Sequence, residues 1–280
     1  MNASTVWLAP AKINLFLHIT GQRADGMHEL QTVFQFLELS DRLRFMPLPD
    51  GRIKQASAIP GVTPEQDLCL RAAHLLRDQG GMTAGVEISL EKNIPIGGGL
   101  GGASSDAATT LHALNQLWGL AASEDDLATL GLQLGADVPI FVRGLAAWAE
   151  GVGEKITPLT LPQPWYAVID TGVHVSSAEM FVNSQLTRNC PRLTMCPPQV
   201  GTYANVFEPL VRKRYAKVDR VFDWLASFGT PFLTGTGGCV VIACESEQDA
   251  LAIQAQAIHD VRVLVAKGRN ISPLRQQLTQ

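Results

Sequence analysis

A run of glycines in the first half of the chain has the pattern of a phosphate-binding loop. Five of the six residues from Gly97 to Gly102 are glycine, and Ser104 and Ser105 follow. Glycine lets the backbone approach a ligand closely and adopt positive φ angles, so several N–H groups can point at one anion. Residues 86–90 alternate apolar and polar like a strand, and the two serines are good N-caps for a helix. A helix that begins beside the loop adds partial positive charge, which favours bound phosphate.

The loop departs from two common phosphate-binding patterns. Gly97-x-Gly99-x-x-Gly102 fits the dinucleotide fingerprint, but this fit is nearly automatic in a run of glycines. The fingerprint also needs a second strand that ends in an acidic residue about 20 positions on, whereas a helix is predicted to open at Ser123. A Walker A loop needs Gly-Lys-Ser/Thr, and here Ala103 stands at the lysine position. A cation that offsets phosphate charge must therefore come from elsewhere in the chain.

One lysine near the N-terminus could supply that cation. Residues 6–19 predict two strand segments separated by Pro10, which fits a sheet edge or a bulge. Lys12 and Asn14 share one face of the second segment, and the other face carries Ile13, Leu15 and Leu17. Taken alone, Lys12 is better interpreted as a solvated strand residue.

Asp137 is a candidate catalytic base. It follows a helix predicted over residues 123–134 and precedes residues 138–142, an apolar run that resembles a strand. The ring of Pro139 and the apolar neighbours would make the carboxylate stiff and partly dry, as a general base requires. A solvated turn residue is the more frequent outcome for such a position.

The composition describes an ordinary soluble globular protein. The chain has 280 residues, 46% of them hydrophobic and 17% charged, enough for one large core or two modest ones. Its net charge of −4 argues against a broad nucleic-acid surface. The five cysteines are scattered without C-x-x-C spacing, so we expect neither a disulfide framework nor a zinc site. Without a visible signal peptide or convincing membrane span, we expect a cytoplasmic protein with no membrane partner.

The second half alternates predicted strands and helices. Residues 159–164 are the best linker, and strands are predicted at residues 166–170 and 261–265. Helices are predicted over residues 176–185, 205–225 and 247–257, in addition to an earlier helix over residues 67–77. A second glycine-rich loop lies within residues 232–242. This order is consistent with a small α+β sandwich.

Three motifs in order resemble the GHMP kinase superfamily, whose members phosphorylate small-molecule alcohols with ATP. They are Pro10-Ala-Lys-Ile-Asn-Leu, Pro95-Ile-Gly-Gly-Gly-Leu-Gly-Gly-Ala-Ser-Ser and Leu233-Thr-Gly-Thr-Gly-Gly-Cys, and they span the chain. The resemblance implies an α+β, two-domain GHMP kinase fold. Residues 1–160 would form an ATP-binding domain like domain 2 of ribosomal protein S5. Residues 161–280 would form a ferredoxin-like domain, with the substrate between the two.

Within the superfamily, four further segments resemble the members whose substrate is cytidine diphosphate methylerythritol: residues 20–28, 134–139, 149–154 and 266–273. The resemblance implies transfer of the γ-phosphoryl group of ATP to the 2-hydroxyl of that small molecule. It assigns Asp137 as general base and Lys12 as charge stabiliser. Mg²⁺ is implied by the use of ATP; its ligands are unassigned, with the hydroxyls of Ser104 and Ser105 as candidates.

The resemblance also implies two sets of binding residues. The nucleotide set runs from the end of a strand through the glycine loop: Lys92, Pro95, Ile96, Gly97, Gly98, Gly99, Leu100, Gly101, Gly102, Ala103, Ser104 and Ser105. The substrate set is dispersed along the chain: Asn14, Met27, His28, Ser177, Phe181, Gly235, Thr236 and Gly237. In the family, the histidine reads a cytosine, which stacks between a tyrosine and a phenylalanine.

This chain departs from the family pattern at the tyrosine, where it carries Met27. A thioether can lie on a ring face, but it replaces an aromatic stack worth about 1–3 kcal/mol per base. Three alternatives remain open: a mevalonate- or homoserine-type kinase of the same superfamily, a nicotinamide-dependent oxidoreductase, and a non-catalytic nucleotide-binding module. The expected assembly is a monomer or a weak homodimer.

Overall fold

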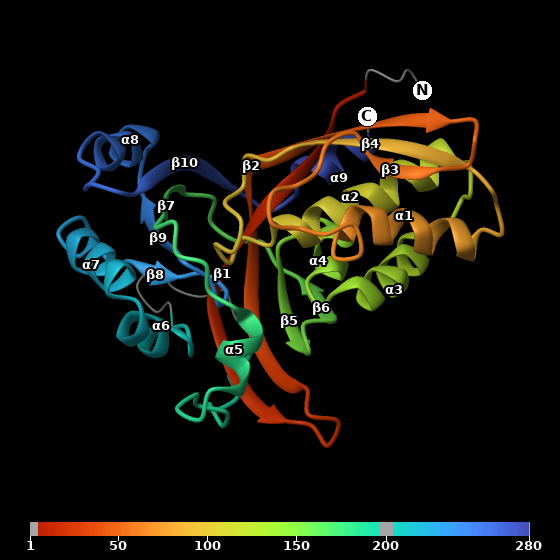
Figure 1. Cartoon of the computed structure of the whole chain (residues 1–280). Coiled ribbons are helices and arrows are strands. Elements are labelled where there is room, and N and C mark those ends of the chain that lie inside the picture. The colour runs from red at the N-terminus through yellow and green to blue at the C-terminus, as the bar shows by residue number, and fades with distance from the viewer. Residues whose placement is uncertain (1–4, 196–203, 280) are drawn as a thin grey trace.

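The computed structural model describes residues 5–195 and 204–279, and its strands form one continuous sheet (Figure 1). The longest strands, β1 and β2, form an antiparallel ribbon whose hairpin joins Gln22 to His28. On the first-half side, β2 also pairs with β4 and β5, β3 runs parallel to β4, and β6 extends β5. The first-half strands are β1 (Trp7–Gln22), β2 (His28–Leu48), β3 (Ile53–Gln55), β4 (Gly85–Glu91), β5 (Ala147–Gly151) and β6 (Lys155–Pro158).

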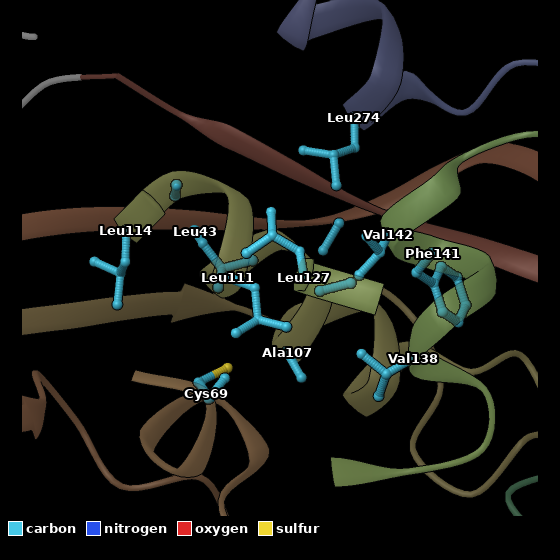
Figure 2. Close-up of a cluster of buried hydrophobic side chains, with 14 of the residues drawn as sticks. Leu43, Cys69, Ala107, Leu111, Leu114, Leu127, Val138, Phe141, Val142 and Leu274 are labelled. Carbon is cyan, nitrogen blue, oxygen red and sulfur yellow. The ribbon is translucent and has the colours of Figure 1, made fainter. Parts of the chain in front are cut away.

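Four helices cover one face of this part of the sheet and enclose its core (Figures 1 and 2). Helix α2 lies at the centre and contributes Leu111 and Leu114, which are fully buried against Leu43 of β2. Because nearly every face of α2 meets another element, all residues from Ser105 to Leu114 are buried, including polar ones such as Asp106 and His112. The four helices are α1 (Leu68–Gln79), α2 (Gly102–Leu117), α3 (Glu124–Leu134) and α4 (Val138–Arg143).

The second half builds an antiparallel sheet in the order β10-β7-β9-β8, with a separate core around Phe207 and Phe222. Strand β10 pairs with β7 and, at Gly268 and Arg269, with β2, so it joins the two halves. The elements are β7 (Trp165–Asp170), α5 (Ser177–Val182), α6 (Glu208–Arg214), α7 (Ala216–Leu225), β8 (Phe232–Leu233), β9 (Cys239–Cys244), α8 (Glu247–Ala255), β10 (Arg262–Arg269) and α9 (Pro273–Leu278).

The α+β fold class is confirmed, and most predicted elements lie within a few residues of their expected bounds. The proposed division at residues 160/161 stays a prediction. The C-terminal helix α9 returns to the first half, where Leu274 joins the core and Gln277 hydrogen-bonds to the backbone of Leu8. None of the helices in the described ranges combines the length and apolar character that crossing a membrane requires. Of the five cysteines, Cys196 lies outside the described residues.

Two predicted elements were wrong in kind. Residues 138–142, expected as a strand, form the short helix α4, with Pro139 in its first turn. Proline fits there because it needs no N–H partner and its fixed φ suits a helix. Residues 205–225, expected as one helix, form α6 and α7, separated at Tyr215, whose φ of −124° and ψ of 92° are extended.

Two local predictions were also wrong. Gly101, with a φ of 73°, is the N-cap of α2, so Ser104 and Ser105 lie inside its first turn and do not cap it. Leu17 was expected beside Ile13, but it packs in the second core. The cause is a register shift in β1 between Asn14 and Phe16, which inverts the alternation of faces. A further shift between Pro10 and Lys12 confirms the bulge predicted at the proline.

Candidate active site

The glycine loop sits where the two halves of the chain meet. Gly97 and Gly99 have φ angles of 74° and 80°, which favour glycine. A Cβ atom on Gly99 would lie 2.1 Å from the carbonyl oxygen of Thr234, so no side chain fits between the two loops. The amide of Cys239 donates to the carbonyl of Gly98 at 3.2 Å. The second glycine-rich loop therefore holds the first one from behind.

Lys12 is buried beside this loop, with its side chain only 3% exposed. Its ammonium group donates to Asn14 Oδ1 at 2.6 Å and to the Gly99 carbonyl at 3.2 Å, and lies 3.3 Å from Asp137 Oδ2. An ammonium has three donors, and these partners fix its direction. Asn14 is held in turn by Thr32, which accepts from Asn14 Nδ2 at 2.8 Å. The solvated-strand interpretation of Lys12 is therefore wrong.

Asp137 immediately precedes α4, and its carboxylate faces Lys12. Its side chain makes no capping hydrogen bond to the helix and is 38% exposed. The carboxylate is therefore held on one side by an ammonium and open to a ligand on the other. A carboxylate in this setting can accept a proton from a bound hydroxyl group.

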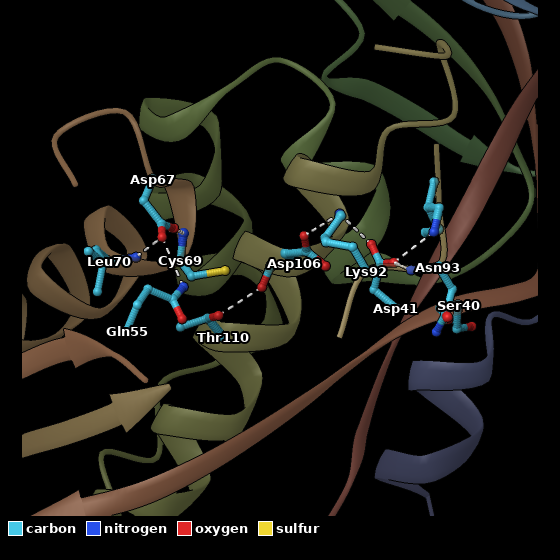
Figure 3. Close-up of polar contacts among 11 residues, drawn as sticks. Ser40, Asp41, Gln55, Asp67, Cys69, Leu70, Lys92, Asn93, Asp106 and Thr110 are labelled. Atoms are coloured by element: carbon cyan, nitrogen blue, oxygen red, sulfur yellow. Dashed lines mark hydrogen bonds and ion pairs between the residues drawn. The ribbon is translucent and has the colours of Figure 1, made fainter. Parts of the chain in front are cut away.

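Lys92 lies between two buried carboxylates (Figure 3). Its Nζ is 2.5 Å from Asp41 Oδ2 and 2.8 Å from Asp106 Oδ2. Burial alone would lower the pKa of Lys92, but the charges of Asp106 and Asp41 raise it above its usual value. Asp41 also accepts from the amides of Asn93 and Ile94, at 2.5 and 2.8 Å. This Lys92 cage ties β2, the start of the glycine loop and α2 together.

One ammonium cannot neutralise both carboxylates of the cage. Burial raises the pKa of Asp106 to about 7; Lys92 opposes the shift and the charge of Asp41 adds to it. Asp41 accepts three hydrogen bonds, whereas Asp106 Oδ1 has no partner among the described residues. The extra proton therefore belongs on Asp106, because the charged form is the less solvated there.

A cavity of about 360 Å³ brings most of the predicted residues together. Its size is in the range of small-molecule sites. It is lined by Lys12, Asn14, Lys92, Asp137, Ser177, Phe181, Gly235, Thr236 and residues 95–104. Four predicted residues lie outside the lining: Met27, His28, Ser105 and Gly237. Ser105 is fully buried within α2, and a Cβ on Gly237 would lie 2.1 Å from the amide nitrogen of Gly99, so both support the loop from behind.

The sequence interpretation missed one wall of this cavity. Ile59 and Val62 come from the irregular segment before α1, and residues 66–69 come from the beginning of that helix. Ile59, Val62 and Leu68 add apolar surface to the cavity lining. No motif marks them, because they belong to an irregular segment and the beginning of a helix, without a pattern of their own.

The remaining predicted substrate residues lie past Phe181, at the hairpin between β1 and β2. The rings of His28 and Phe181 are 5.0 Å apart at an angle of 32°, and Phe181 also packs edge-on against Phe207. Met27 is 48% exposed. Burial and the nearby charge of Arg188 lower the pKa of His28. We call Met27, His28, Phe181 and Arg188 the base end, and the glycine loop with Lys12 and Asp137 the phosphate end.

The phosphate end offers oxygen donors that suit Mg²⁺. Among the described residues no group of three or more histidine, cysteine, aspartate or glutamate side chains could hold a metal ion. Mg²⁺ bound to a nucleotide needs only one or two protein ligands in addition to phosphate and water. Of the two candidate serines, Ser104 lines the cavity, whereas Ser105 is fully buried within α2.

Comparison with known proteins identifies the family. Residues 67–145 match the GHMP kinases N terminal domain, and residues 195–261 match the GHMP kinases C terminal domain. A 4-diphosphocytidyl-2-C-methyl-D-erythritol kinase of Nitrosococcus oceani is 50% identical over 96% of both chains. The chain belongs to the 4-diphosphocytidyl-2-C-methyl-D-erythritol kinase family. A kinase of this family from Pseudomonas aeruginosa is 48% identical, again over 96% of both chains.

Solved structures agree with this family. A crystal structure of a 4-(cytidine 5'-diphospho)-2C-methyl-D-erythritol kinase covers 94% of this chain, with 32% identity and a TM-score of 0.80. A mevalonate kinase covers 95% with 16% identity and a TM-score of 0.70, which shows a shared fold alone. The chain is thus a small-molecule kinase of the GHMP superfamily, whose members use ATP. The oxidoreductase interpretation of the glycine run is excluded.

Proposed function

We propose that this kinase transfers the γ-phosphoryl group of ATP to the 2-hydroxyl of 4-diphosphocytidyl-2-C-methyl-D-erythritol in non-mevalonate isoprenoid biosynthesis. The observation that carries the proposal is the 3.3 Å ion pair of Lys12 and Asp137. Lys12 also donates to the carbonyl of Gly99, which places the pair beside the glycine loop. The names of relatives about 50% identical over nearly the whole chain support the choice of substrate.

In the proposed reaction, Asp137 accepts the hydroxyl proton as the hydroxyl oxygen forms a bond to the γ-phosphorus. The bond from that phosphorus to the bridging oxygen breaks, and ADP leaves with the electron pair. Lys12 offsets negative charge on the transferred group, and the amides of residues 97–102 bind the triphosphate. Mg²⁺ bound to ATP would neutralise the β- and γ-phosphate oxygens, and the Ser104 hydroxyl, which lines the cavity, would be available to hold it.

At the base end, we propose that His28 and Phe181 hold the cytosine, with Met27 covering part of the ring. The centroids of the His28 and Phe181 rings are 5.0 Å apart, so the two rings are in contact. A bound base would therefore lie beside the two rings or push them apart. The apolar side formed by Ile59 and Val62 leaves a separate place for the adenine of ATP. We further propose that the enzyme is cytoplasmic and works as a monomer or weak homodimer.

A coupled ADP-release assay tests the function directly. Diphosphocytidyl-methylerythritol, mevalonate and homoserine are supplied side by side at equal concentration. We expect ADP release with the cytidine compound alone. Release with mevalonate or homoserine but not with the cytidine compound would assign the chain to another branch of the superfamily.

A further inference from the structure

One arginine links the two side chains of the base end. Arg188 follows α5, and its Nε donates to His28 Nε2 at 3.1 Å. Its Nη2 donates to the carbonyls of Phe181 and Asn183 at 2.8 and 2.9 Å, and its Nη1 to that of Leu186 at 3.2 Å. In the described residues, none of these partners is a carboxylate. The guanidinium is thus used for hydrogen bonding rather than for an ion pair.

The contact with Arg188 determines which nitrogen of His28 carries the proton. A guanidinium has donors only and stays protonated in proteins. His28 Nε2 must therefore accept, so a neutral ring has its hydrogen on Nδ1. A second proton on His28 would remove this hydrogen bond and place two cations together, in agreement with the lowered pKa of His28.

The same guanidinium fixes the neighbouring aromatic ring. By binding the carbonyls of Phe181 and Asn183, Arg188 closes the last turn of α5 and holds Phe181 between His28 and Phe207. Lysine could not replace it, because a single ammonium lacks the planar fork that reaches four acceptors in different directions.

We propose that Arg188 is a specificity-determining positioning residue, which holds His28 as the Nδ1–H donor facing the base. The proposal rests on the proposed function in assuming that the base is cytosine. Cytosine presents acceptors at N3 and O2, which an Nδ1–H group complements. O2 is an acceptor in uracil as well, but uracil carries a hydrogen on N3, so an Nδ1–H group directed at N3 discriminates between the two bases. Arg188 would therefore select the base without touching it.

The tautomer can be measured in the ligand-free protein. Nitrogen-15 NMR of histidine-labelled protein at pH 8 distinguishes a protonated from an unprotonated ring nitrogen, and His28→Gln assigns the signals. We expect His28 to carry hydrogen on Nδ1 in the wild type and to shift toward Nε2–H in Arg188→Met. Arg192→Met is the matched control, because Arg192 pairs with Glu29 next to His28 and does not contact the ring. An unchanged tautomer in Arg188→Met overturns the proposal.

Steady-state kinetics supplies the second readout. In Arg188→Met we expect KM for the cytidine substrate to rise about tenfold or more, as the loss of hydrogen bonds to a charged group predicts. Both kcat and the KM for ATP should stay within about threefold of the wild type. Arg188→Lys, which keeps the charge, should restore little of the KM. Equal loss of kcat and of ATP binding would show a merely structural residue. If the wild type does not use the cytidine compound, the proposed function fails, while the NMR result still decides the role of Arg188.

Discussion

The phosphate end and the base end of the cleft are built in opposite ways. At the phosphate end, Lys12 is buried and has a partner for each of its three donors, and the glycine loop is clamped by a second loop. At the base end, Met27 is half exposed and His28 reaches only one described hydrogen-bond partner, Arg188. Phosphoryl transfer depends on exact placement of charge, which the buried and fully partnered Lys12 can supply.

The largest effect is expected at Asp137, the proposed base. Asp137→Asn keeps the shape but cannot accept a proton, so kcat should fall about 10²- to 10⁴-fold. Binding of ATP should be nearly unchanged, because the amides of the glycine loop remain. Steady-state kinetics and ATP titration measure the two quantities. If Asp137→Asn keeps most of its kcat, Asp137 is not the catalytic base.

Tight packing at the phosphate end is tested by a pair of glycines. In Gly99→Ala, the added Cβ meets the Thr234 carbonyl at 2.1 Å, at a φ of 80°. Gly26, in the base-end hairpin, has a φ of 85° and no atom within 4 Å of a Cβ. Gly26→Ala should therefore lose only the conformational term of about 1–2 kcal/mol of unfolding free energy, and Gly99→Ala about 1–3 kcal/mol more. Urea unfolding measures both, and equal losses would contradict the clamp.

The Lys92 cage predicts a dependence of stability on pH. The pKa of Asp106 is about 7 in the folded protein, above the usual value for aspartate. Between about pH 4 and pH 7 the unfolded chain releases a proton that the folded chain keeps, so the contribution of Asp106 to stability falls as pH rises. Asp106→Asn cannot ionise. The difference in unfolding free energy between Asp106→Asn and the wild type should therefore shift in favour of the variant between pH 5 and pH 8. The shift should be on the order of 2 kcal/mol.

Asp126 provides the matched control for this pH effect. Hydrogen bonds from the side chain and backbone of Ser123 lower the pKa of Asp126, so folded and unfolded chains are both ionised above pH 5. The difference between Asp126→Asn and the wild type should stay constant between pH 5 and pH 8. If Asp106→Asn behaves in the same way, Asp106 is ionised in the folded protein and the account of the cage is wrong.

The smallest effect is expected at Met27. Met27→Tyr restores the aromatic face, worth about 1–3 kcal/mol per stacked base, against about 0.3–1.5 kcal/mol for the thioether it replaces. KM for the cytidine substrate should fall about three- to tenfold with kcat unchanged. Met46→Tyr is the control, because Met46 is similarly exposed at the far end of β2. Equal KM values in the two variants would argue against a base beside Met27.

The sequence predicted the phosphate end far better than the base end, and the reason is physical. A glycine run followed by a helix is a local pattern, and most of its members line the cavity. Lys12 and Asp137 were assigned through the resemblance to the superfamily, because each of them taken alone is better interpreted as a solvated residue. Arg188 could not be found in this way, since its role depends on contact with His28, which lies 160 residues away in the chain.

The errors in the predicted local structure arose where the pattern of apolar and polar residues carries no signal. Residues 138–142 are buried on all sides, so their apolar run has no helical face to reveal α4. Leu17 was placed on the wrong face because a bulge after Asn14 inverts the order, and bulges leave no mark in a pattern of alternating residues. Ile59 and Val62 were missed because they gain their place only through packing.

The most direct test of the separation between the phosphate end and the base end is a change of base in the substrate. The kinase is assayed with 4-diphosphocytidyl-methylerythritol and with its uridine analogue, and kcat and KM are measured for each. Because the reacting groups are identical, we predict a KM at least about tenfold higher for the uridine compound, with kcat within about threefold. Equal KM values, or a loss confined to kcat, would contradict the separation of chemistry at Lys12 and Asp137 from recognition at His28.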